Sequence, residues 1–148
     1  MSVVVDANLV AAILVPLPYR PQAKAKLYTW REAREELFAP TLMEYEVCST
    51  LRRAVLAGWV AAEKVPEMLV QMRRLGVQTV PPTIALHRAA LEWAQRLGRT
   101  RTYDAQYMAL AEELRADFWT SDLKLFNRAK QLGLAWVHSV LEPTAPPA

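Results

Sequence analysis

The amino-acid sequence predicts an α/β fold in which helices cover both faces of a parallel sheet. Short β-branched or apolar segments alternate along the chain with longer amphipathic segments, one or two at a time. All four glycines follow an amphipathic segment, the place where helices commonly end. Because parallel strands need long crossover connections, this alternation favours parallel over antiparallel pairing.

Five short segments are predicted to be strands. Residues 2–5 read Ser-Val-Val-Val, a β-branched run typical of a strand buried on both faces. The remaining four are stretches between helical segments, at residues 37–39, 77–80, 117–120 and 134–138.

The segments between these strands are predicted to be helices. Thr41 and Glu44 have the spacing of a capping box at the start of one helix, and Thr102 is a candidate cap of another. The predicted helices cover residues 7–14, 21–35, 41–57, 61–75, 83–97, 103–115 and 122–132.

Length and composition indicate one domain. The chain has 148 residues and is 53% hydrophobic, enough to bury a sizeable core, so a disordered chain is excluded. Residues 1–141 form the predicted domain, and the Pro- and Ala-rich residues 142–148 are a predicted loose tail.

The sequence fits neither a membrane-spanning protein nor a disulfide-rich secreted protein. The longest apolar run, residues 9–17, is shorter than the roughly 20 residues of a membrane helix. No basic region precedes an apolar stretch at the N-terminus, so we expect no secretory signal and a cytoplasmic protein. Cys48 is the sole cysteine, which excludes an internal disulfide and a cysteine zinc cluster, and we expect it to be a small buried residue.

Acidic residues follow two of the predicted strands. Asp6 ends the first strand, and Asp122 comes just after the strand at residues 117–120. Glu46 lies on or beside the apolar face of its helix, and Asp104 lies in the first turn of another helix. Asp117 begins its strand, at the other end of the sheet, and is expected to be structural or on the surface. In parallel sheets, ligands bind at the carboxyl ends of the strands, where the chain order reverses.

Two interpretations of these acids stay open on the residues alone. Each aspartate is also a good helix cap or first-turn residue, a role that needs no ligand. Converging carboxylates, however, repel one another and are costly to bury unless a cation is present. Hard oxygen ligands select Mg²⁺ or Mn²⁺, and no histidine or cysteine is placed for a zinc site.

The chain resembles the PIN-domain family of nucleases, which includes the VapC-like toxins. Four stretches carry the resemblance, in the family's order, each with one acid: VVVDAN with Asp6, APTLMEYEVCSTLRR with Glu46, TYDAQYMALAEEL with Asp104, and FWTSDLKL with Asp122. The resemblance spans residues 3–126, nearly the whole chain.

The resemblance implies a three-layer sandwich with a central parallel five-stranded sheet, and a Mg²⁺- or Mn²⁺-dependent ribonuclease. It implies that all four acids are catalytic and hold the metal, with Asp6 at the centre, and that hydrolysis leaves a 5′-phosphate and a 3′-hydroxyl. Asn8 falls in the family's opening motif and is a candidate to orient Asp6 or a water. Thr120 and Ser121 are candidates to hydrogen-bond Asp122 or a substrate phosphate, with a helix cap as their other reading.

The same resemblance implies partners. The RNA substrate needs cations, and Arg99 and Arg101, shortly before Asp104, are the candidates, although arginines in loops are often only solvated. A VapC-like toxin of a type II toxin–antitoxin pair would be restrained by an antitoxin and would form a homodimer.

Three alternatives stand beside this function. They are a catalytically inactive RNA- or partner-binding module whose acids are only caps, a free-standing PIN nuclease of RNA maturation, and a haloacid-dehalogenase-like phosphatase. The last lacks support, because the start Asp-Ala-Asn does not contain that family's Asp-x-Asp pair.

Overall fold

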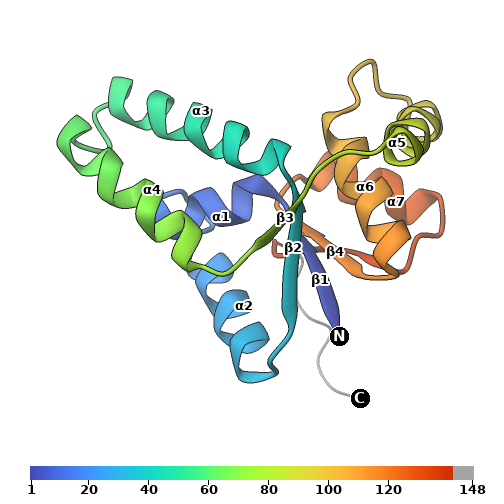
Figure 1. The fold of residues 1–148 in the computed structure, drawn as a ribbon, viewed down its shortest axis with the longest axis horizontal. Helices are drawn as coiled ribbons and strands as arrows, with labels where there is room; N and C mark the ends of the chain where they lie inside the picture. The colour runs from blue at the N-terminus through green and yellow to red at the C-terminus, as the bar shows by residue number, and fades with distance from the viewer. Residues whose placement is uncertain (142–148) are drawn as a thin grey trace.

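The computed structural model describes residues 1–141 and contains one five-stranded sheet (Figure 1). The strands are β1 (Ser2–Val5), β2 (Glu36–Pro40), β3 (Gln78–Val80), β4 (Asp117–Thr120) and β5 (Val137–Ser139). They lie in the order β3-β2-β1-β4-β5, and every pair is parallel. The predicted parallel five-stranded sheet is therefore confirmed, while the predicted tail at 142–148 lies outside the described residues.

Helices cover both faces of this sheet and complete the predicted three layers. They are α1 (Ala7–Leu14), α2 (Arg20–Glu32), α3 (Leu42–Leu56), η1 (Ala62–Lys64), α4 (Val65–Arg74), α5 (Ile84–Leu97), α6 (Tyr103–Leu114) and α7 (Leu123–Gln131). In Figure 1, α1 to α4 lie on one side of the sheet and α5 to α7 on the other.

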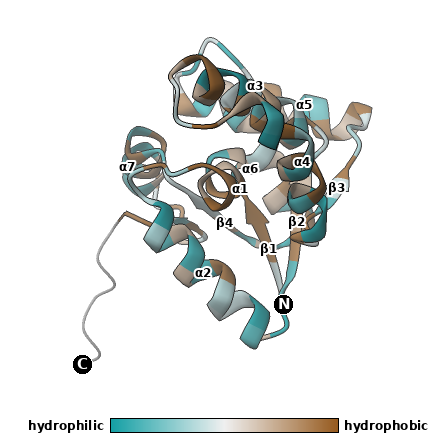
Figure 2. Ribbon diagram, turned by 90° about the vertical axis from the view of Figure 1, so that its left-hand side faces the viewer, coloured by the Kyte–Doolittle hydropathy of each residue, from teal (hydrophilic) through white to brown (hydrophobic). Residues whose placement is uncertain are grey.

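The first strand is central because its residues are apolar on both faces. Val3, Val4 and Val5 are all buried, and β1 pairs with β2 on one side and β4 on the other. Helix α1 is apolar around most of its circumference and packs in the core, where Figure 2 colours both α1 and β1 brown. The chain therefore builds β2 and β3 on one side of β1 and then returns to build β4 and β5 on the other.

Helix α5 ends at Gly98, as the sequence predicts. This residue has φ 68, the left-handed conformation that glycine adopts without steric cost. The backbone N–H of Arg99 donates to the carbonyl of Ala94 at 2.9 Å, the pattern of a Schellman cap. The cap fixes where the connection to α6 begins.

The predicted capping box of α3 is wrong. Thr41 already has helical backbone angles, and its side chain accepts no capping hydrogen bond. Glu44 instead accepts two hydrogen bonds from Arg73 of α4, at 3.0 and 3.3 Å. This ion pair joins the start of α3 to the end of α4, so the two helices run in opposite directions and project from the sheet as a pair (Figure 1).

Three smaller predictions also differ from the structure. Thr102 stands at the cap position of α6 but makes no capping hydrogen bond, because its backbone lacks the extended conformation that aims a cap. The last strand begins at Val137, since residues 134–136 are needed to turn the chain after α7. Cys48 is exposed, because it lies on the outer face of α3. No helix among residues 1–141 has both the length and the apolar character to cross a membrane.

Candidate active site

The candidate site lies where the direction of strand addition reverses, between β1 and β4. The chain leaves β1 for α1 and leaves β4 for α7, so the carboxyl ends of these neighbouring strands lie side by side at one edge of the sheet. Asp6 follows the first strand and Asp122 follows the second. In open parallel sheets, this reversal point is where ligands bind.

Asp6 is the most buried of the acids, with 6% of its surface exposed. One carboxylate oxygen accepts a hydrogen bond from the Thr120 hydroxyl at 2.7 Å, and the other lies 3.4 Å from the backbone nitrogen of Asn8. Burial raises the pKa of Asp6 from 3.8 to about 7; the Thr120 bond opposes this rise, and the charges of Asp104 and Glu46 add to it.

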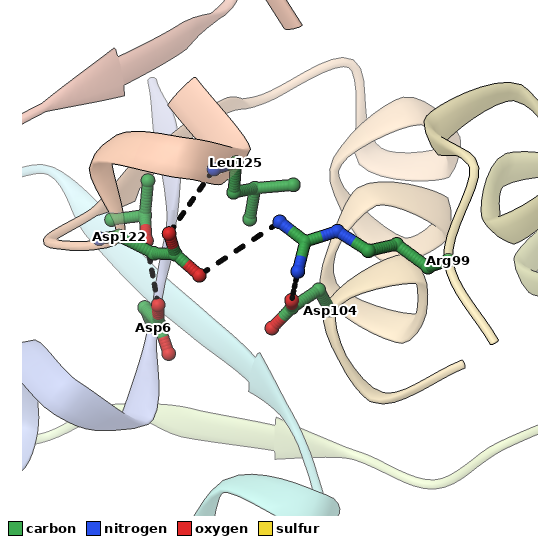
Figure 3. Close-up of polar contacts among 6 residues, drawn as sticks. Asp6, Arg99, Asp104, Asp122 and Leu125 are labelled. Atoms are coloured by element: carbon green, nitrogen blue, oxygen red, sulfur yellow. Dashed lines mark hydrogen bonds and ion pairs between the residues drawn. The ribbon is translucent and has the colours of Figure 1, made fainter. Parts of the chain in front are cut away.

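Thr120 links the two strand-end aspartates. Its buried hydroxyl donates to Asp6 and accepts a hydrogen bond from the backbone N–H of Asp122 at 3.0 Å. Asp122 caps α7, because one of its oxygens accepts from the N–H of Leu125 at 3.1 Å. The other oxygen faces Arg99 (Figure 3). Asp122 is therefore a helix cap whose second oxygen stays available to the site.

Asp104 enters the site from the first turn of α6. Figure 3 shows it below the guanidinium of Arg99, which lies between Asp104 and Asp122. The Arg99 nitrogens are 3.8 Å from Asp104 and 4.0 Å from Asp122. Burial and the charge of Asp122 raise the pKa of Asp104, and Arg99 partly offsets that rise.

Glu46 reaches the site from α3 and is held by a tyrosine. The hydroxyl of Tyr107, on α6, donates to a Glu46 oxygen at 2.7 Å. Burial raises the pKa of Glu46, the Tyr107 bond lowers it, and the charge of Asp104 raises it further. The ring of Tyr107 is 1% exposed and stacks on Phe118, so packing fixes the position from which it donates.

The four acids form one electrostatic group. The charge of at least one other member raises the pKa of Asp6, Glu46 and Asp104, so deprotonating all of them is costly without a cation. Among residues 1–141, no three acidic, histidine or cysteine side chains are gathered closely enough to hold an ion as they stand. The side chains of Asp104 and Asp122 are each about one-third exposed, and both face Arg99. The donor set, all hard oxygens, fits Mg²⁺ or Mn²⁺.

Comparison with known proteins identifies the family. The family model described as PIN domain matches residues 3–132. The chain belongs to the PIN-domain family. Among curated relatives of this PIN domain, Ribonuclease VapC9 of Mycobacterium tuberculosis is 35% identical over 123 residues, which cover 83% of this chain and 87% of the relative.

Two further matches agree with this assignment. Ribonuclease VapC3 of Pyrobaculum aerophilum is 30% identical over 132 residues, which cover 86% of this chain and 95% of the relative. The crystal structure of PAE2754 from the same organism superposes with a TM-score of 0.64. That match covers 95% of this chain and 84% of the other, at 24% identity, and it supports the PIN fold alone.

The supporting residues predicted from the sequence take different places in this PIN domain. Thr120 contacts Asp6 and the backbone of Asp122, as described above. Asn8 contributes its backbone N–H to Asp6, while its exposed side chain lines a groove beside Glu46. Ser121 is half-buried; within the described chain, no hydrogen bond joins it to any of the four acids, and it does not cap α7.

The groove beside Glu46 has a volume of about 430 Å³. Arg53 and Arg101 place cationic groups along it, and the rings of Tyr45 and Tyr103 form part of its wall. Both tyrosine side chains are more than half exposed. The two arginines predicted to contact substrate therefore occupy different places. Arg101 lines this groove, whereas Arg99 lies beside the carboxylate of Asp104.

Tyr107 is the residue of this site that sequence reasoning missed. The apolar stripe of α6, which includes Met108 and Leu110, indicates only a core position for it. Its position three residues after Asp104 places both on one face of α6, which indicates the side of the helix but not the partner of the hydroxyl.

Removing the Tyr107 hydroxyl tests its role in positioning Glu46. We expect Tyr107→Phe to lower RNA cleavage by about tenfold, the range seen for groups that orient metal ligands, while the fold persists because the ring still packs on Phe118. Cleavage rates and melting temperatures of both proteins give the comparison. An unchanged rate in Tyr107→Phe would contradict the positioning role.

Proposed function

We propose that this protein is a divalent-metal-dependent endoribonuclease and the toxin of a type II toxin–antitoxin pair. The observation that carries the proposal is the convergence of Asp6, Glu46, Asp104 and Asp122 at the β1–β4 reversal point of a PIN domain. The activity is that of the relatives named ribonuclease, at 30 and 35% identity over most of the chain.

The carboxylates hold the metal in this proposal. Asp6 is the central ligand, with Glu46, Asp104 and Asp122 around it. When bound by these carboxylates, Mg²⁺ or Mn²⁺ would supply an activated water and would neutralise charge on the phosphate. The hydroxyl of Thr120 favours the charged form of Asp6, because it donates to the carboxylate, and the hydroxyl of Tyr107 does the same for Glu46.

The groove beside Glu46 supports RNA as the ligand of the site. Guanidinium groups suit phosphate oxygens, and Arg101 and Arg53 line the groove. Exposed aromatic rings stack on unpaired bases, and Tyr45 and Tyr103 line the same groove. We therefore place a single-stranded segment of the substrate here, with Arg101 as a phosphate ligand.

Exposed apolar side chains support the proposal that the chain binds other proteins. Leu56, Trp59 and Val70, on or beside the projecting α3–α4 pair, are each more than half exposed, and Ile84 and Leu91 are similarly exposed on α5. Large exposed apolar side chains are candidates for burial against another protein. An antitoxin and a second copy of the chain are the partners we propose, in the cytoplasm.

The function is tested with purified protein and labelled single-stranded and structured RNAs. We expect internal cleavage with Mg²⁺ or Mn²⁺ and none with EDTA. Cleavage that continues in EDTA would contradict the metal dependence. RNA binding without cleavage, together with no rise in melting temperature on adding Mn²⁺, would favour the inactive binding module instead.

A further inference from the structure

Arg99 lies between Asp104 and Asp122, two of the four acids, and is not among the residues that line the groove beside Glu46. One guanidinium nitrogen is 3.8 Å from Asp104 and the other is 4.0 Å from Asp122. Figure 3 shows the guanidinium reaching between these two carboxylates, with Asp6 nearby. The side chain thus places a fixed positive charge where the two acids face each other.

The fold directs Arg99 to this position. Its backbone N–H closes the Schellman cap of α5 on Ala94, directly after the left-handed Gly98. Five residues later Asp104 lies in the first turn of α6, so the short connection keeps the arginine next to its first partner. The cap therefore fixes the backbone from which the Arg99 side chain extends toward the two carboxylates.

Both contacts are weak enough to be exchanged. The two nitrogen–oxygen distances exceed hydrogen-bond length, and all three side chains are about one-third exposed. Ion pairs of this kind contribute little to stability because water and salt screen them. A divalent cation bound by the same carboxylates would meet like-charge repulsion from the guanidinium at this distance.

We propose that Arg99 is the counter-ion of the carboxylates in the metal-free site. A divalent cation must displace the Arg99 guanidinium in order to bind there. The inference rests on the proposed function, because it takes Asp104 and Asp122 as metal ligands. Arg99 then acts on the carboxylates as a positioning residue: it holds them apart from a metal-binding arrangement and lowers the metal affinity.

Calorimetric titration of metal-free protein with Mn²⁺ tests this proposal without measuring activity. We expect Arg99→Gln to bind Mn²⁺ about tenfold more tightly than the parent at low ionic strength. The difference should shrink as salt is added. The metal-free melting temperature of Arg99→Gln should stay close to that of the parent, because exposed ion pairs contribute little to stability, and Mn²⁺ should raise it more than in the parent. Arg99→Lys, which keeps the charge, should stay near the parent.

Arg101→Gln is the matched control, since it removes the same charge from the same connection without a contact to Asp104 or Asp122. We expect its Mn²⁺ affinity to match that of the parent. Equal tightening in both variants, or no tightening in Arg99→Gln, would overturn the counter-ion role while leaving the proposed function intact. If neither the parent nor Arg99→Gln binds Mn²⁺, both the inference and the metal dependence fail.

Discussion

Replacing Asp6 by Asn is expected to reduce RNA cleavage by at least about a hundredfold while the protein stays folded. The amide keeps the shape of the side chain and still accepts a hydrogen bond from Thr120 at the same place. It removes the charge that is the proposed centre of the metal site. The measurement is the initial rate of cleavage of a labelled RNA in Mg²⁺ or Mn²⁺.

Asp117→Asn provides the control for this variant. Asp117 begins β4, at the opposite end of this strand from Asp122, and one of its oxygens lies 3.5 Å from a ring nitrogen of His138. The same chemical change is made there outside the site, so cleavage should stay at the parental rate. Parental cleavage in Asp6→Asn, or an equal loss in both variants, would count against the central role of Asp6.

The metal-free protein is expected to lose stability as pH rises from about 4 to 8. The pKa of Asp6 is 3.8 in the unfolded chain and about 7 in the folded protein, so the folded state binds the additional proton. The stabilisation from this proton is complete when the pH is below 3.8, the pKa in the unfolded chain, and it is lost as pH rises through about 7, the pKa in the folded protein. The shift corresponds to on the order of 4 kcal/mol, and the raised pKa values of Glu46 and Asp104 act in the same direction.

Urea unfolding in EDTA at several pH values between 5 and 8 measures this effect. In Asp6→Asn, the free energy of unfolding should depend much less on pH than in the parent, and this variant should be more stable than the parent at pH 8. In Asp117→Asn, the pH dependence should match that of the parent. Mn²⁺ should stabilise the parent more at pH 8 than at pH 5, because protons compete with metal for the carboxylates. A parent whose stability in EDTA is constant or rises between pH 5 and 8 would contradict this account.

Most of the fold was predictable because its signals are local. The valine run of β1 and the glycines that end four helices are read directly from neighbouring residues, and the structure places these elements within a few positions of the prediction. The convergence of Asp6 and Asp122 was predictable as well, since parallel strands present their carboxyl ends on one edge of a sheet.

The missed features depend on pairs that are distant in the sequence. Tyr107 and Glu46 are 61 positions apart, and no periodicity in either helix predicts that a tyrosine of the apolar stripe ends on that carboxylate. The capping box failed for a similar reason, because Arg73, from another helix, offers Glu44 a charged partner. The charge of Arg99 and its position shortly before Asp104 made it a candidate to contact substrate, but neither predicts that its guanidinium lies between Asp104 and Asp122.

The order of the strands determines when the candidate site can form during synthesis on the ribosome. Thr120 and Asp6 form their hydrogen bond across 114 positions, because the central strand is made first and its second neighbour nearly last. At about 5–20 residues per second, roughly 6 to 23 seconds separate the synthesis of these two strand ends. A nascent chain that stops before β4 lacks both Asp122 and the strand that buries Asp6. The candidate site therefore assembles only after β4 and Asp122 have been synthesised, and a shorter nascent chain lacks the complete set of four acids.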